Sequence, residues 1–152
     1  MFSISKADLD ADDVRALLKL HLAGMQANTP AGHVFALDLS GLRRPNVTVW
    51  TLRDEGELAG IGAMKALDDG GAEVKSMRTH PDHLRKGVAA AVLEHIIGEA
   101  RARGCRRLSL ETGNGEAFGA ALSLYRKRGF VDGEAFGDYR PSTFNQFLHL
   151  DL

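Results

Sequence analysis

The segment HPDHLRKGVAAAVLEHII, residues 80–97, decides the fold predicted for this chain. A short basic turn ends at Gly87, and apolar residues then recur every four positions, which predicts a helix over residues 87–103. Arg85 and Lys86 precede the positive end of this helix dipole, where cations are unfavourable unless an anion binds. The segment therefore predicts an anion site at the start of the helix.

Alternating apolar runs and turn residues predict the remaining elements. Strands are expected at residues 2–5, 47–53, 57–67, 72–79, 106–111, 130–132 and 142–150, and further helices at 11–26 and 116–128. Asp10 is a candidate cap for the first helix, and residues 33–44 are read as a short helix or a loop. The strand at 72–79 changes its apolar phase between Val74 and Met77. A strand, a crossover helix and another strand favour a mixed α/β sheet with a parallel pair at its centre.

Length and composition suit one domain over residues 1–152. The formal net charge of −1 argues against a polybasic partner surface, and no run of cations with interleaved aromatics indicates nucleic-acid binding. No apolar run reaches the ~20 residues of a membrane span, and the N-terminus does not resemble a signal peptide. The single cysteine, Cys105, excludes an internal disulfide and is expected at a strand edge. We therefore expect a cytoplasmic protein without nucleic-acid or membrane partners.

Two motifs resemble those of the GNAT superfamily, the acetyl-CoA-dependent N-acetyltransferases. MRTHPDHLRKGVAAAVLEHI, residues 77–96, is similar to the family's pyrophosphate-binding motif Q/R-x-x-G-x-G/A, except that Leu84 stands where Gln or Arg is usual. ALSLYRKRGF, residues 121–130, is similar to the family's A-x-x-L-Y-x-x-x-G-F segment. The resemblance implies the GNAT fold, an α/β (α+β) architecture with a mixed central sheet of about six to seven strands, about four helices and a splayed parallel strand pair.

The resemblance also implies where acetyl-CoA binds. Its pyrophosphate would lie on the motif residues Leu84, Arg85, Lys86, Gly87, Val88 and Ala89. Its pantetheine arm would pair with the strand backbone at Met77, Arg78 and Thr79. Asn114 matches the position of a frequent pantetheine contact, but it is equally a turn residue within TGNG.

Three residues are candidates for the chemistry that the resemblance implies. Tyr125 matches the tyrosine that acts as general acid on the leaving thiolate; the alternative is a core tyrosine on an amphipathic helix. Glu73 lies 14 residues before Gly87, like the glutamate base of histone-type members, although it could be an exposed carboxylate after a turn. Glu111 is the rival base and could act through a water.

The acceptor is the least determined part of the site. In this superfamily, residues equivalent to 24–44 and 133–146 select the acceptor, and here they contain His33, Arg43 and Tyr139. The cations in these segments could hold a carboxylate-bearing acceptor or could be solvated loop charges. A small amine or amino-acid-like acceptor is expected, with a protein N-terminus or lysine as the alternative. A homodimer is left open. The spacing of His80 and His83 also occurs in metal sites, but no further ligand cluster supports one, and no metal is expected.

Two other functions fit the same sequence. One is a GNAT-fold module that senses acyl-CoA without catalysis. The other is a phosphate or nucleotide binder of a different α/β class, although neither a GxxxxGK[ST] loop nor a GxGxxG motif is present.

Overall fold

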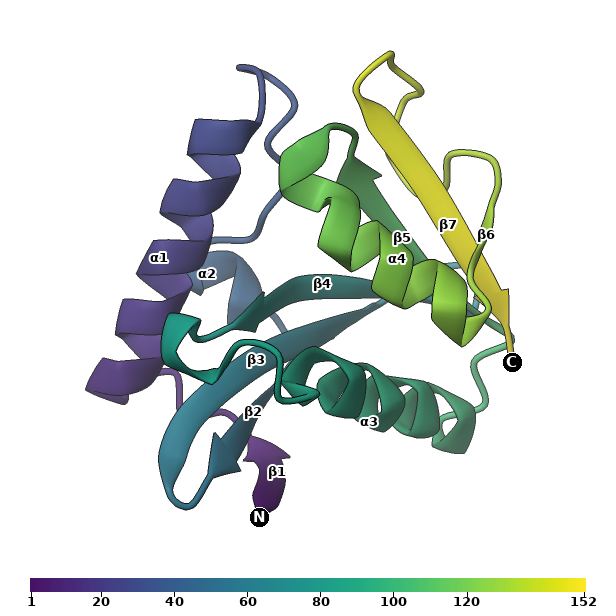
Figure 1. Cartoon of the computed structure of the whole chain (residues 1–152). Helices are drawn as coiled ribbons and strands as arrows, with labels where there is room; N and C mark the ends of the chain where they lie inside the picture. Colours follow the sequence, from purple (N-terminus) through teal and green to yellow (C-terminus); the bar gives the residue numbers. More distant parts are fainter.

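The computed structural model describes residues 1–152 and consists of one seven-stranded sheet with helices on both faces (Figure 1). The strands are β1 (Phe2–Lys6), β2 (Val47–Asp54), β3 (Glu57–Ala66), β4 (Ala72–Thr79), β5 (Arg107–Gly113), β6 (Val131–Asp132) and β7 (Asn145–Asp151). The α-helices are α1 (Asp12–Asn28), α2 (Leu39–Leu42), α3 (Val88–Ala102) and α4 (Gly119–Arg128), with 3₁₀ turns η1 (Pro81–His83) and η2 (Glu116–Phe118). The predicted α/β class and element order are confirmed.

The strand order is β1-β2-β3-β4-β5-β7-β6, and every pair is antiparallel except β4 with β5. That parallel pair is short, since only Ala72 and Glu73 of β4 pair with β5, opposite Leu108 and Ser109. Beyond Glu73 the two strands diverge, so the backbone of β4 has no strand partner on that side. The predicted splayed parallel pair is present at the centre of the sheet.

Two apolar clusters lie on opposite faces of the sheet. The larger one packs α3 and α4 against strand residues such as Trp50, Met64 and Leu110, and in Figure 1 these helices lie in front of the sheet. The smaller one packs α1 and α2 against Val49 and Ile61. Helices therefore cover both faces of the sheet.

Glycines on β3 let α3 approach the sheet closely. A Cβ on Gly60 would lie 2.5 Å from Val88, and one on Gly62 would lie 2.5 Å from Val92. The register between β3 and β4 also shifts opposite Gly62, where Ser76 has a φ of 56°. This bulge is the physical cause of the change of apolar phase seen in the sequence of β4.

Two local predictions were wrong. Asp10 does not cap α1, whose N-cap is Ala11; the Asp10 carboxylate instead accepts hydrogen bonds from Arg15 and Arg43. The helix expected over 116–128 is divided into η2 and α4, and its first turn is 3₁₀.

Gly129 ends α4 in the left-handed conformation, with a φ of 109°. None of the helices combines the length and the apolar character needed to cross a membrane.

Candidate active site

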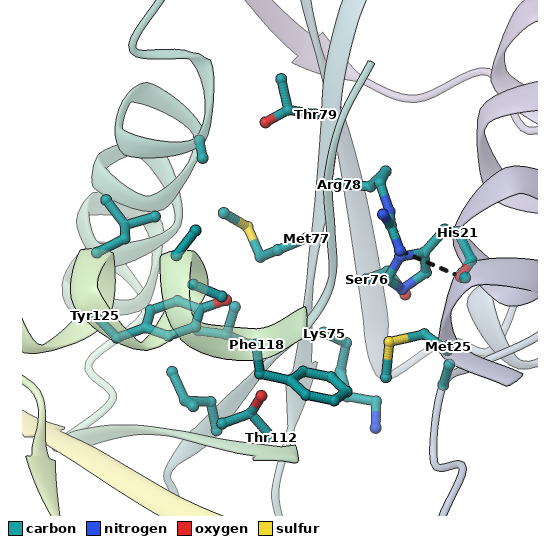
Figure 2. A pocket seen from close by; sticks show the side chains of 18 of the residues that line it. His21, Met25, Lys75, Ser76, Met77, Arg78, Thr79, Thr112, Phe118 and Tyr125 are labelled. Carbon is teal, nitrogen blue, oxygen red and sulfur yellow. Dashed lines mark hydrogen bonds between the residues drawn. The ribbon is translucent and has the colours of Figure 1, made fainter. Parts of the chain in front are cut away.

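A cleft of about 670 Å³ opens where β4 and β5 diverge. It is lined by β4 and β5 and by residues of α1, α3 and α4, so it lies at the junction of the two helical layers and the sheet. In Figure 2, Tyr125 and Met77 occupy one side of this cleft, and His21 with Arg78 occupies the other. The side chains of Met77 and Arg78 are successive on β4 and point to opposite sides.

One end of the cleft presents backbone N–H groups that have no partner. None of the N–H groups from Arg85 to Ala90 donates a hydrogen bond within the chain, and the first bond of the helix runs from Ala91 N–H to the Gly87 carbonyl at 3.1 Å. Arg85 and Gly87 both have left-handed backbone, with φ of 64° and 83°. The first turn of α3 contains no acidic residue. Free N–H groups at a helix N-terminus attract anions such as phosphate, because the helix dipole adds to their hydrogen bonds.

Tyr125 is a buried residue of α4 that lines the cleft. Its ring packs edge-on against Phe130, with centroids 5.7 Å apart. Burial raises the pKa of its phenol well above the ordinary value, so the hydroxyl keeps its proton at any working pH. That hydroxyl donates no hydrogen bond within the chain, which leaves it available to a group bound in the cleft.

The two candidate carboxylates differ in their surroundings. Glu73 is buried, and its Oε2 accepts a hydrogen bond from the Tyr139 hydroxyl at 2.5 Å and lies 3.3 Å from Lys75 Nζ. Glu111 accepts a single hydrogen bond, from Asn145 Nδ2 at 2.7 Å. Burial, opposed in part by Lys75, raises the pKa of Glu111 to about 7. Glu111 is therefore the carboxylate whose proton exchanges near neutral pH.

Lys75 of β4 joins two distant segments, the one that precedes α2 and the one that precedes β7. Its Nζ donates to the Phe35 carbonyl at 2.9 Å and to the Tyr139 hydroxyl at 2.9 Å, in addition to its pairing with Glu73. The rings of Phe35 and Tyr139 also meet edge to face, with centroids 5.2 Å apart. These contacts fix the segments before α2 and before β7 over the cleft.

His21 and Arg78 form the opposite wall (Figure 2). Arg78 Nε donates to His21 Nδ1 at 3.0 Å, and Nη2 lies 3.4 Å from the His21 carbonyl oxygen. Burial, with the positive charges of Arg78 and Lys75, lowers the pKa of His21 to about 4. His21 is therefore neutral at neutral pH and acts as an acceptor for the guanidinium.

The sequence matches the acetyltransferase (GNAT) family over residues 14–130. The chain belongs to the GNAT acetyltransferase family. It is an acyltransferase of the N-acetyltransferase type.

Several known GNAT proteins resemble the whole chain. It is 47% identical to the N-acetyltransferase YedL of Escherichia coli, covering 100% of this chain and 96% of YedL. It is 37% identical to an IAA acetyltransferase of Azospirillum brasilense, covering 81% of this chain and 80% of that protein. The solved structure of an acyl-CoA N-acyltransferase from Klebsiella pneumoniae superposes with a TM-score of 0.80 at 26% identity, covering 100% and 98% of the two chains.

A Bacillus subtilis acetyltransferase solved in complex with CoA shares the GNAT fold with this chain. The TM-score is 0.75 at 19% identity, and the match covers 100% of this chain and 99% of that one.

The GNAT cleft gathers most of the residues singled out in the sequence. Its lining includes Glu73, Met77, Arg78, Thr79, Leu84, Arg85, Gly87, Val88, Ala89, Glu111 and Tyr125. Tyr139 is connected to the lining through Glu73 and Lys75. His33 contacts Asn145, the residue that donates to Glu111, with 3.2 Å between Nδ1 and Oδ1.

Three predicted residues point away from the GNAT cleft. The Lys86 ammonium lies 3.3 Å from His83 Nδ1 and 3.9 Å from Asp54. Asn114 donates to the Thr143 carbonyl at 2.8 Å, as a turn residue would. Arg43 pairs with Asp10 at the far end of α1.

Sequence reasoning missed the side chains of Lys75 and His21 and the amide of Asn145. Lys75 lies two residues from Glu73 on the same strand, so strand alternation places both on one side of β4. His21 follows Val14, Leu17 and Leu18 along the buried face of α1, and that helical spacing could have assigned it to the interior.

Proposed function

We propose that this protein transfers the acetyl group of acetyl-CoA to a primary amine of a small, amino-acid-like molecule, within a ternary complex. One observation carries the proposal: a single cleft joins the unpartnered N–H groups of residues 85–90 to the hydroxyl of Tyr125 and the carboxyl of Glu111. The first group suits a pyrophosphate, and the other two suit acyl transfer to an amine.

Acetyl-CoA binding is supported at two places on β4 and α3. The pyrophosphate would accept hydrogen bonds from the loop and first turn of α3, with the Arg85 guanidinium adding a positive charge at the rim. The pantetheine amides would pair with β4 beyond Glu73, where the strand has no neighbour on the β5 side. Ser76 also has a buried Oγ without any hydrogen-bond partner, at the bulge that lines this part of the cleft.

The reaction needs three proton transfers, two from the acceptor nitrogen and one to the leaving sulfur. Glu111 accepts a proton from the acceptor ammonium, directly or through a water, and its pKa of about 7 suits that task at neutral pH. The amine nitrogen then attacks the thioester carbonyl carbon, a C–N bond forms and the C–S bond breaks. Tyr125 donates its proton to the leaving sulfur, and the second proton that the nitrogen loses on becoming an amide returns to the Tyr125 oxygen. The products are an amide and free CoA.

Direct transfer is favoured over an acetylated enzyme. The single cysteine, Cys105, lies outside the cleft, just before β5, so no thiol is available there to carry the acetyl group. The cleft also has a wall on the α1 side, where an acceptor would bind beside the thioester. Both substrates would then be present together.

The test is protein-dependent release of CoA thiol from acetyl-CoA. The acceptors would be amino acids, polyamines, aminoglycosides and short peptides, and Tyr125→Phe would be the control. Release with one class of acceptor, reduced at least tenfold in the variant, supports the proposal. Tight binding of acetyl-CoA without release for any acceptor would instead favour a non-catalytic acyl-CoA sensor.

A further inference from the structure

The charges that line the cleft do not all balance within the chain. The charged lining residues are Glu73, Lys75, Arg78, Arg85 and Glu111. Lys75 and Glu73 pair with each other at 3.3 Å. Arg85 belongs to the anion-binding loop, where the proposed pyrophosphate would face it. The remaining two side chains are Arg78 on one wall and Glu111, the proposed base, on β5.

Arg78 has no anionic partner. It is half-buried and forms none of the salt bridges found in the chain. Its only hydrogen bonds run from Nε and Nη2 to the imidazole and carbonyl of His21, at 3.0 and 3.4 Å. Nη1 donates to nothing within the chain. Burying a guanidinium in part, with N–H donors unpaired, costs free energy of folding that a bound anion would offset.

His21 orients this guanidinium without neutralising it. The imidazole is buried, and its Nδ1 accepts the Nε–H of Arg78, which fixes the plane of the guanidinium against α1. Gly24, one turn further along α1, leaves room for the group: a Cβ there would lie 2.9 Å from Arg78 Nη2. The arrangement holds a positive charge at a defined place on the cleft wall. A fork of fixed donors matches the geometry of a carboxylate.

Apolar side chains also line this part of the cleft. Met25 of α1, Phe35 of the segment before α2 and Phe118 of η2 all line the same cleft. Figure 2 shows Met25 beside His21, and Phe118 between Met25 and Tyr125 at the floor of the view. An acceptor in this space would contact hydrocarbon as well as the guanidinium.

We infer that Arg78 binds the carboxylate of the acetyl acceptor, so that the substrate is an amino acid with an apolar side chain. Its amine lies toward Glu111, its carboxylate against the Arg78 guanidinium, and its side chain against Met25, Phe35 and Phe118. This inference rests on the proposed function, because the acceptor amine is the one that receives the acetyl group.

The test compares acceptors that differ only in the carboxylate. Each amino acid, such as leucine or phenylalanine, is paired with its amide and with its decarboxylated amine, and α-, β- and γ-amino acids are included. Wild-type kcat/KM should favour the free acid over its partners by at least tenfold, the scale of a charge-assisted hydrogen bond. Arg78→Gln should bring that ratio to about one, whereas Arg78→Lys should retain part of it.

The matched control is Lys19→Gln, which removes one positive charge from the exposed side of α1 and should keep the wild-type ratio. Acetyl-CoA affinity within about threefold of wild type shows that Arg78→Gln is folded. If Arg78→Gln does not fold, the test rests on the wild-type ratio of kcat/KM between each free acid and its amide. Transfer to amines regardless of a carboxylate, or an unchanged ratio in Arg78→Gln, would overturn the inference but leave the proposed function intact. No thiol release with any amine would reject both.

Discussion

Glu111→Gln should make the protein more stable and almost inactive at the same pH. In the folded chain burial raises the pKa of this carboxyl from 4.5 to about 7, so ionising it is unfavourable to folding. That difference corresponds to about 3 kcal/mol, and contact of the partly exposed carboxyl with solvent reduces it to about 1–2 kcal/mol. Glutamine has the shape of the neutral acid and can still accept the Asn145 hydrogen bond.

The sign of the effect depends on pH. Below pH 4.5 Glu111 is protonated in both the folded and the unfolded chain, so the variant and the wild type should be equally stable. As pH rises from 4.5 through 7, Glu111 ionises more readily in the unfolded chain than in the folded one. The free energy of unfolding of the wild type therefore falls over this range, whereas that of the variant does not. The full difference of about 1–2 kcal/mol should therefore appear at pH 8, in urea unfolding curves of both proteins.

The activity of the same variant tests the role of the carboxylate. Loss of a positioned base should lower kcat/KM by at least about 100-fold. With an acceptor amine of low pKa, wild-type kcat/KM should rise with pH and level off above about 7, a dependence that the variant should lack. Glu116→Gln, an exposed carboxyl on η2, is the control for both assays. Equal stability at pH 8 would refute the buried-acid reasoning, and retained activity would refute the assignment of the base.

Three further predictions concern other parts of the cleft. Tyr125→Phe should lower kcat at least tenfold, measured as thiol release, while the Kd for acetyl-CoA stays near wild type; unchanged turnover would remove Tyr125 from the mechanism. Gly87→Glu should abolish acetyl-CoA binding in calorimetric titrations while the circular dichroism spectrum is kept. A Cβ there meets nothing within 4 Å, and the left-handed backbone costs only about 1–2 kcal/mol for a non-glycine residue. Normal binding by this variant would contradict the anion site. His21→Gln should flatten the acid side of the stability curve. In the wild type the imidazole gains a proton on unfolding between pH 6.5 and about 4, so the free energy of unfolding falls by up to about 3 kcal/mol over that range. A curve for the variant as steep as that of the wild type would contradict this.

The elements around β4 and α3 could be predicted because local patterns encode them. The four-residue apolar repeat of α3 reflects one buried face, and the glycines of β3 reflect close packing of that helix. The change of phase in β4 was visible as well, since the bulge at Ser76 alters which side chains face inward. The start of α4 was predicted wrongly because the same apolar residues fit a 3₁₀ turn followed by a helix.

The side chains of the acceptor wall could not be predicted in the same way. Arg78 meets His21 across 57 residues of sequence, and Lys75 meets Tyr139 across 64. No local spacing relates such pairs; only the packing of α1 and the final loop against β4 brings them together. Arg43 was predicted from its place in a segment that selects the acceptor in this superfamily, yet Asp10 holds its guanidinium outside the cleft.

The central claim, direct acetyl transfer to an amine within this cleft, is tested most directly by following an isotopically labelled acetyl group. The protein would be incubated with labelled acetyl-CoA and a carboxylate-bearing amine, and the products separated and identified by mass spectrometry. We predict that the label appears in the amide of the acceptor, with one free CoA thiol for each amide formed, and that Tyr125→Phe slows this step. Label that remains on CoA, accumulates on the protein or appears only as acetate would contradict the account.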